Sequence, residues 1–118
     1  MIVIKFGGHA MKTGTNAPWL EQIAQRWKSG ERFVIVHGGG PQIDQELKRR
    51  SIESEFVDGF RVTTPEIVSV VEMVLTGTVL REVVRSLQNS GLNAVGITGG
   101  DGGLDRKSTR LNSSHTVI

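Results

Sequence analysis

Three glycine-rich loops and one lysine are the residues whose types and spacing could bind an anion. Gly7-Gly8, Gly38-Gly39-Gly40 and the run 99–103 each follow a short apolar segment, and Lys5 stands just before the first glycine pair. Glycine lets the backbone approach a ligand closely, and free N–H groups beside a helix start attract negative charge. The pattern indicates phosphate or carboxylate binding, although each loop alone would also suit a tight turn and a lone strand-end lysine is commonly just solvated.

The spacing of these glycines argues against two familiar nucleotide-binding motifs. No Gly-Lys-Ser/Thr follows either of the first two loops, as a Walker loop requires. The Gly-x-Gly-x-x-Gly fingerprint of nicotinamide-dependent oxidoreductases is also missing after the first apolar segment. The glycine loops therefore match neither of these two motifs.

Short apolar runs and helical spacing predict the elements that position these loops. Residues 1–6, 33–36 and 94–97 read as strands buried on both faces. Pro18 opens an amphipathic helix that ends before Gly30, and a second helix begins at Pro41. Because ligands bind at the carboxyl ends of strands in open parallel sheets, the loops are expected to line one crevice.

The stretch between the second and third strands has its own signals. Asp58-Gly59 between two short apolar runs predicts a tight β-hairpin. Helical spacing then continues from Pro65 to about Asn89, and we expect a break near Gly77 into two helices. The order of elements predicts an α/β fold, a three-layer αβα sandwich with a mainly parallel sheet.

Composition excludes several classes of protein. The 118 residues include no cysteine, so no disulfide or thiolate metal site is expected, and a reducing, cytoplasmic setting is the natural default. No apolar run approaches the roughly 20 residues needed to cross a bilayer. Residues 1–104 hold eleven basic and eleven acidic side chains, so the net charge of +2 lies in the tail and a nucleic-acid partner has little support.

The last fourteen residues, 105–118, differ in kind from the rest. They contain no glycine and no sustained periodicity. The run Asp105-Arg-Lys-Ser-Thr-Arg-Leu-Asn-Ser-Ser-His115 resembles the translation of a common sequencing adapter. We therefore expect one lobe over residues 1–104 and a non-native tail over residues 105–118.

Five motifs, in order and with matching spacings, resemble the acetylglutamate kinases of the amino acid kinase superfamily. They are Lys5-Phe-Gly-Gly-His-Ala-Met11, Val36-His-Gly-Gly-Gly-Pro-Gln-Ile43, Gly59-Phe-Arg-Val-Thr63, Val71-Glu-Met-Val-Leu-Thr-Gly77 and Val95-Gly-Ile-Thr-Gly-Gly-Asp-Gly102. The resemblance implies transfer of the γ-phosphoryl of MgATP to the side-chain carboxylate of N-acetyl-L-glutamate, which gives an acyl phosphate in arginine biosynthesis. One departure is Leu80-Arg81, where the family commonly has Asn-Lys.

The resemblance also implies roles for individual residues. Lys5 would be catalytic, neutralising charge on the transferring phosphoryl group, and Arg61 would pair with the α-carboxylate of the substrate. Glycine N–H groups would hold the two anionic substrates, with Gly39 and Gly40 on the acceptor and Gly7, Gly8 and Gly38 on phosphate. His37 and Asp101 are expected to be structural, and no metal ligand is assigned within this chain.

The same resemblance sets expectations for the whole protein. The lobe that binds ATP and Mg²⁺, with its catalytic aspartate and second lysine, is expected to be missing from this chain, so the fragment alone should be inactive. A homodimer would form through the helices near Val68 to Val84. Two alternatives stay open, namely a kinase acting on carrier-protein-bound aminoadipate or glutamate, and a non-catalytic amino-acid-binding domain.

Overall fold

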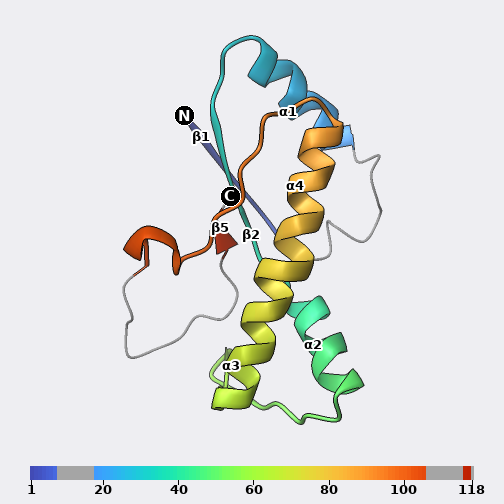
Figure 1. The fold of residues 1–118 in the computed structure, drawn as a ribbon, viewed down its shortest axis with the longest axis vertical. Helices are drawn as coiled ribbons and strands as arrows, with labels where there is room; N and C mark the ends of the chain where they lie inside the picture. The colour runs from blue at the N-terminus through green and yellow to red at the C-terminus, as the bar shows by residue number, and fades with distance from the viewer. Residues whose placement is uncertain (8–17, 106–115, 118) are drawn as a thin grey trace.

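Two parallel strands form the centre of the fold (Figure 1). The computed structural model describes residues 1–7, 18–105 and 116–117. Strand β1 (Ile2–Phe6) pairs in parallel with β2 (Phe33–His37), with Ile4 opposite Ile35. Helix α1 (Pro18–Lys28) lies between them in the chain, so the predicted α/β unit with a parallel sheet is confirmed.

The remaining elements follow β2 in the chain. They are α2 (Gly40–Arg49), β3 (Phe56–Val57), β4 (Phe60–Arg61), α3 (Pro65–Glu72), the π-helix η3 (Met73–Val79), α4 (Leu80–Asn89), the short 3₁₀ turn η4 (Asp101–Gly103) and β5 (Thr116–Val117). Thr64 caps α3, because its hydroxyl accepts a hydrogen bond from the Ile67 N–H at 3.3 Å. None of the described helices is both long and apolar enough to cross a membrane.

The described helices pack on one face of the sheet. Ile4 and Ile35, which stand opposite each other, share this face and join a core to which every helix from α1 to α4 contributes. On the other face, Val3 is 65% exposed. The described residues therefore give a sheet with one helical layer, and the second layer of the expected sandwich is not among them.

The predicted β-hairpin is confirmed. Strands β3 and β4 are antiparallel, with Phe56 opposite Arg61. Asp58 and Gly59 have φ angles of 52° and 80°. Both values lie in the left-handed region, as a two-residue type I′ turn requires.

The expected helix break near Gly77 is wrong. Residues 65–89 form one unbroken helical rod (Figure 1), in which seven residues, Met73 to Val79, take the wider π form. The Thr76 hydroxyl donates to the Glu72 carbonyl within this stretch, at 2.6 Å. Gly77 lies inside the π segment and does not end the helix.

The spacing of buried side chains explains the π segment. The rod buries apolar residues in adjacent pairs, and the steps between successive pairs are four, five and four residues. The pairs are Val70–Val71, Val74–Leu75, Val79–Leu80 and Val83–Val84. A regular α-helix returns to one face after about 3.6 residues, so a step of five would rotate the next buried pair away from the core. The wider π turn accommodates the extra residue and keeps all four pairs inward.

The expected third core strand at residues 94–97 is also wrong. This segment forms no strand, and Val95 is 70% exposed. Instead it lies along α4, where a Cβ on Gly96 would be 2.6 Å from Arg81 Nη2 and 2.9 Å from Val84 Cγ2. The position beside β2 belongs to β5, which pairs antiparallel with Val36 and His37.

Candidate functional site

The carboxyl ends of β1 and β2 meet at one end of the sheet, so two of the three strands expected to line the crevice come together. Lys5 is opposite Val36, and the loop 38–40 leaves the sheet directly after β2. Lys5 is exposed and belongs to the face that also carries Val3, opposite the helical layer. Gly7 is exposed at the same edge, whereas Gly8 lies outside the described residues.

The loop 38–40 opens helix α2 with its backbone close to other elements. Helix α2 begins at Gly40 with Pro41 in its first turn, and no side chain caps it. The first N–H groups of such a helix have no partner within the helix, and its dipole favours an anion there. A Cβ on Gly39 would lie 2.8 Å from Leu75 Cδ2, so a larger residue there would require Leu75 to shift, whereas Gly40 and Gly7 face open space.

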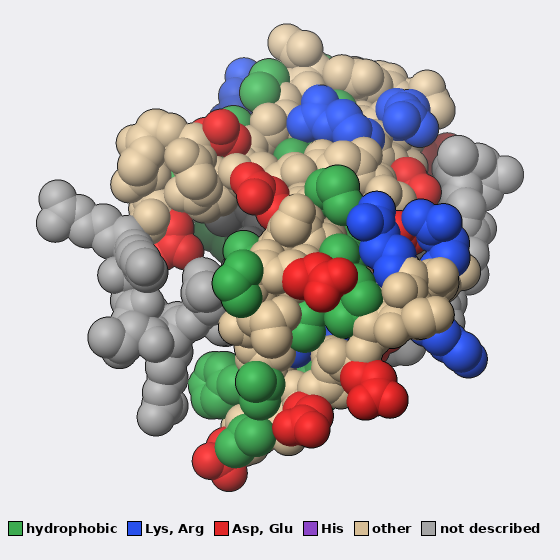
Figure 2. Space-filling model, turned by 60° about the horizontal axis from the view of Figure 1, so that its bottom comes forward, with side chains coloured by type: hydrophobic (Ala, Val, Ile, Leu, Met, Phe, Trp, Pro, Cys, Tyr) green, Lys and Arg blue, Asp and Glu red, His purple; other side chains and the backbone are tan. Residues whose placement is uncertain are grey.

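Arg61 reverses the usual pattern of burial on the hairpin. It is 8% exposed, whereas Phe56, Val57 and Phe60 are 41% to 58% exposed. Figure 2 shows apolar side chains gathered among acidic ones on this end of the molecule. Burying a guanidinium costs free energy unless it is paired, so Arg61 is expected to have partners within the fold.

Three contacts hold the buried guanidinium. Arg61 Nη1 donates to Ser54 Oγ at 2.9 Å, and Nη2 donates to Asp44 Oδ1 at 2.8 Å. The guanidinium also lies over the Phe56 ring, 4.7 Å from its centroid. The hairpin, the segment before it and helix α2 together fix this one side chain.

Asp44 connects Arg61 to the helix that follows the glycine loop. It lies four residues after Gly40 on α2, and therefore about 6 Å along the helix axis from that residue. The Asp44 contact therefore places the Arg61 guanidinium at the second turn of α2, one helical turn beyond Gly39 and Gly40. Lys5 stands at the carboxyl end of β1, on the sheet face opposite the helical layer.

His37 and Asp101, for which structural roles are expected, both make hydrogen bonds to neighbouring residues. His37 is 1% exposed, and its Nδ1 donates to the Gly38 carbonyl at 2.9 Å. Burial lowers the pKa of the imidazole, which favours its neutral form. Asp101 Oδ2 accepts from the Thr98 N–H at 2.7 Å and from its hydroxyl at 3.2 Å, which closes the turn after residue 97.

The same residues offer donors for an anion but few ligands for a metal ion. The start of α2 offers N–H donors suited to a phosphate or carboxylate. In the described ranges, no three His, Cys, Asp or Glu side chains come together as a metal site would require. These residues fit an anionic ligand, and they supply no ligand set for Mg²⁺.

Sequence reasoning missed Asp44 and Ser54, the two side chains that bind Arg61. Each is an ordinary polar residue on a helix or in a connection, and their contacts with Arg61 span 17 and 7 residues of sequence. The only available signal was the position of Asp44, one helical turn beyond the glycine loop.

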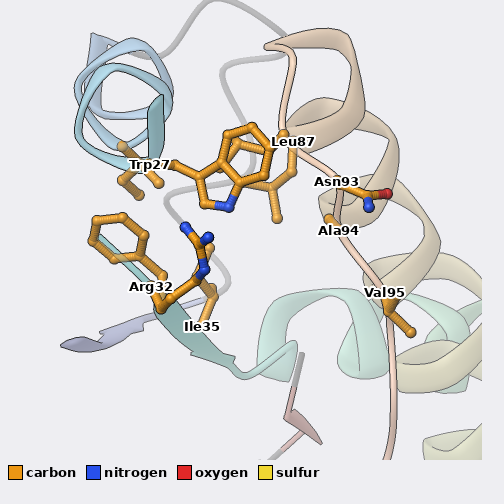
Figure 3. Close-up of a pocket in the computed structure, with 10 residues that line it drawn as sticks. Trp27, Arg32, Ile35, Leu87, Asn93, Ala94 and Val95 are labelled. Carbon is orange, nitrogen blue, oxygen red and sulfur yellow. The ribbon is translucent and has the colours of Figure 1, made fainter. Parts of the chain in front are cut away.

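A cavity of about 200 Å³ lies away from this site, at the start of β2 (Figure 3). Trp27 of α1, Ile35 of β2 and Leu87 of α4 line it together with residues 92–95. None of the predicted site residues borders it. It fills the space between β2 and the segment that was expected to be the third strand.

Comparisons with known proteins identify the family of the chain. Residues 1–117 match the Amino acid kinase family. The chain is 52% identical to the acetylglutamate kinase of Acidothermus cellulolyticus, over 87% of this chain and 35% of that protein. It is 49% identical to the acetylglutamate kinase of Clavibacter michiganensis, over 88% of this chain and 35% of that protein. It is 45% identical to the acetylglutamate kinase of Prochlorococcus marinus NATL1A, over 99% of this chain and 39% of that protein.

A solved structure resembles the fold as well. The crystal structure of smu.665 from Streptococcus mutans UA159 superimposes with a TM-score of 0.74 at 29% identity, covering 80% of this chain and 38% of that one. The chain spans between 35% and 39% of the length of each relative compared here.

Proposed function

The chain belongs to the amino acid kinase family, and from this premise we propose that it is the part of an acetylglutamate kinase that binds N-acetyl-L-glutamate. The observation that carries the proposal is the buried Arg61 guanidinium, held by Asp44 at the second turn of α2. A planar guanidinium suits a carboxylate, and the N–H groups at the helix start suit a second anionic group. N-acetyl-L-glutamate carries two carboxylates.

The chemistry proposed for this site is phosphoryl transfer to a carboxylate. ATP, bound with Mg²⁺ in the complete kinase, supplies the γ-phosphoryl group. An oxygen of the side-chain carboxylate forms a bond to the γ-phosphorus as the bond to ADP breaks, which leaves an acyl phosphate. Such a transfer depends on positioning and on stabilising negative charge.

The roles proposed within this chain follow from that chemistry. Lys5 supplies positive charge at the sheet edge. The backbone of Gly39 and Gly40 orients the acceptor, and the backbone of Gly7, Gly8 and Gly38 holds phosphate. Arg61 binds the α-carboxylate and thereby fixes the reacting carboxylate at a set distance from it.

The complete kinase is proposed to form a homodimer through the helical rod. Val68 and Met73 are 36% and 45% exposed on it, and a partner subunit would cover such apolar side chains. The proposed contact extends over residues 68–84.

Ligand binding tests the proposed acceptor site. N-acetyl-L-glutamate should bind the purified chain in a calorimetric titration, and Arg61→Lys should lose most of the affinity, because an ammonium keeps the charge but lacks the planar pair of donors. Arg49→Lys is the matched control, since Arg49 is exposed on α2 and pairs with Glu46. Equal affinity in Arg61→Lys and the parent chain would refute the assignment.

Turnover provides a separate test. The chain alone is expected to form no acyl phosphate from ATP and N-acetyl-L-glutamate, because it spans only 35% to 39% of the relatives named above. Trapping of the product with hydroxylamine would detect it. Formation of the hydroxamate by the purified chain would contradict this expectation.

A further inference from the structure

The Arg61–Asp44 pair differs from two other arginine–carboxylate pairs in the described part of the chain. Arg26 and Arg49 each donate from both Nε and Nη2 to one carboxylate, that of Glu31 or Glu46. These are complete two-donor forks of the kind that guanidinium groups favour. Arg61 instead gives Asp44 only Nη2.

The second donor of the Arg61 fork is buried and unused. Nε is shielded from solvent and has no hydrogen-bond partner among the residues that the structure describes. A buried donor without a partner is costly, and the cost is largest for a charged group. Nη1 is already engaged with Ser54, so the pair of donors left for an incoming carboxylate is Nε and Nη2.

The Asp44 side chain can move out of this ion pair far more easily than the Arg61 side chain can. Its side chain is 57% exposed, whereas that of Arg61 is 4% exposed. The Asp44 carboxylate can therefore turn into water and regain its hydration. Arg61 is fixed by Ser54 and by the Phe56 ring, and it would remain in place.

We propose that Asp44 is an exchangeable internal ligand that competes with the substrate carboxylate for the Nε–Nη2 edge of Arg61. This inference rests on the proposed function, because it takes the α-carboxylate of N-acetyl-L-glutamate as the incoming ligand. Asp44 satisfies one donor of the fork while the site is empty. The substrate then displaces it and satisfies both donors, so Asp44 sets how tightly a carboxylate must bind to enter.

Two substitutions of opposite chemistry test the exchange. Asp44→Asn removes the charge that competes, and we expect N-acetyl-L-glutamate to bind about fivefold more tightly. Asp44→Glu lengthens the side chain so that it can reach both donors, and we expect weaker binding. A residue that merely supported the fold would weaken binding in both variants.

A matched control separates exchange from general electrostatics. Glu46→Gln removes one negative charge from the same helix without touching Arg61, because Glu46 pairs with Arg49 and Arg50. Its affinity for N-acetyl-L-glutamate should stay within about twofold of the parent chain. The Arg61 Nε–H resonance, followed by ¹⁵N NMR, should shift on titration in the parent chain, in Asp44→Asn and in Glu46→Gln.

The outcomes distinguish this inference from the proposed function. If Arg61→Lys loses binding but Asp44→Asn binds no more tightly than Glu46→Gln, the acceptor site stands and the exchange is refuted. If Arg61→Lys binds as well as the parent chain, the acceptor site itself fails. An N-acetyl-L-glutamate analogue with its α-carboxylate converted to an amide should leave the Arg61 Nε–H resonance unmoved, and a shift would overturn the proposed exchange.

Discussion

The α-carbon of Gly39 rests against Leu75 of the π-helix, so closely that a methyl group there would require Leu75 to move. A Cβ built there would lie 2.8 Å from Leu75 Cδ2 and 3.1 Å from Val79 Cγ2. The φ angle of Gly39 is 179°, which any residue can adopt, so close packing is the constraint. The position of the glycine loop is therefore set by the rod behind it.

Gly39→Ala is expected to destabilise the chain by about 1–3 kcal/mol, the usual cost of adding a methyl group to a packed interior. Gly40→Ala is the matched control for stability, because a Cβ at Gly40 meets nothing within 4 Å. Urea unfolding followed by circular dichroism would measure both. Equal stability of the two variants would show that Leu75 and Val79 adjust freely.

Deleting Gly77 should convert the π segment into an ordinary α-helix without unfolding the chain. The deletion turns the steps between buried pairs into four, four and four, which a regular helix keeps on one face. We expect the helical signal to be preserved and the melting temperature to change by only a few degrees. Circular dichroism and a thermal melt would test this.

Deleting Glu72 instead is the control for that experiment. It also removes one exposed residue of the rod, but it changes the first step to three and turns Val74 and Leu75 away from the core. A loss of about 3 kcal/mol or more is expected, comparable with emptying a buried leucine site. If both deletions were equally harmful, the spacing would not be the cause of the π segment.

Stability should fall as the pH drops below about 6.5, the ordinary pKa of histidine. Burial lowers the pKa of His37 in the fold, so below that pH the unfolded chain binds a proton that the folded chain does not. His37→Asn retains a side-chain N–H for the Gly38 carbonyl and does not titrate. Melting temperatures from pH 7.5 to 5.5 should decline more steeply in the parent chain than in this variant.

Glu46 should contribute a small stability that disappears in acid. Hydrogen bonds from Arg49 and Arg50 lower the pKa of Glu46 to about 2. The contribution is complete above the ordinary carboxyl pKa of about 4.3 and is lost as the pH falls from there toward 2. Glu46→Gln should melt about 2 °C below the parent chain at pH 7, and the difference should vanish near pH 2. A difference that persisted at pH 2 would assign the effect to packing.

Removing residues 105–118 tests the proposed boundary at Leu104. The truncation frees the edge of β2 that β5 covers at Val36 and His37. We expect residues 94–97 to pair there as the strand predicted from their sequence, and their amides to become protected from hydrogen exchange. Reading the genomic locus across this boundary without adapter chemistry would test the origin of the tail, and a genomic sequence that encodes residues 105–118 would refute the adapter interpretation.

The sequence predicted local structure well where one local signal was decisive. The Asp58-Gly59 turn requires two positive φ angles, and the run 33–36 is apolar throughout, so both elements were found. The π segment was missed because Gly77 was read as a helix breaker, although the five-residue step between buried pairs was visible. The strand at 94–97 failed for a different reason, since pairing depends on which segment reaches the edge of β2.

The candidate site was harder to predict than the fold. The glycine loop carries a strong composition signal, and its place at the start of α2 was correct. The partners of Arg61 have no such signal in the sequence, because Asp44 and Ser54 contact it only through tertiary packing. A pattern along the chain can locate donors, but it does not reveal which of their hydrogen bonds the fold leaves incomplete.

The reversed burial of the hairpin has a consequence for engineering. A buried ion pair can often be replaced by apolar residues of similar volume with no loss of stability. In a library of this chain sorted only for resistance to heat, Arg61→Leu and Arg61→Met are therefore expected to be enriched. Such a screen would discard the carboxylate-binding guanidinium while reporting improvement, and selection on this scaffold needs a ligand present at every round.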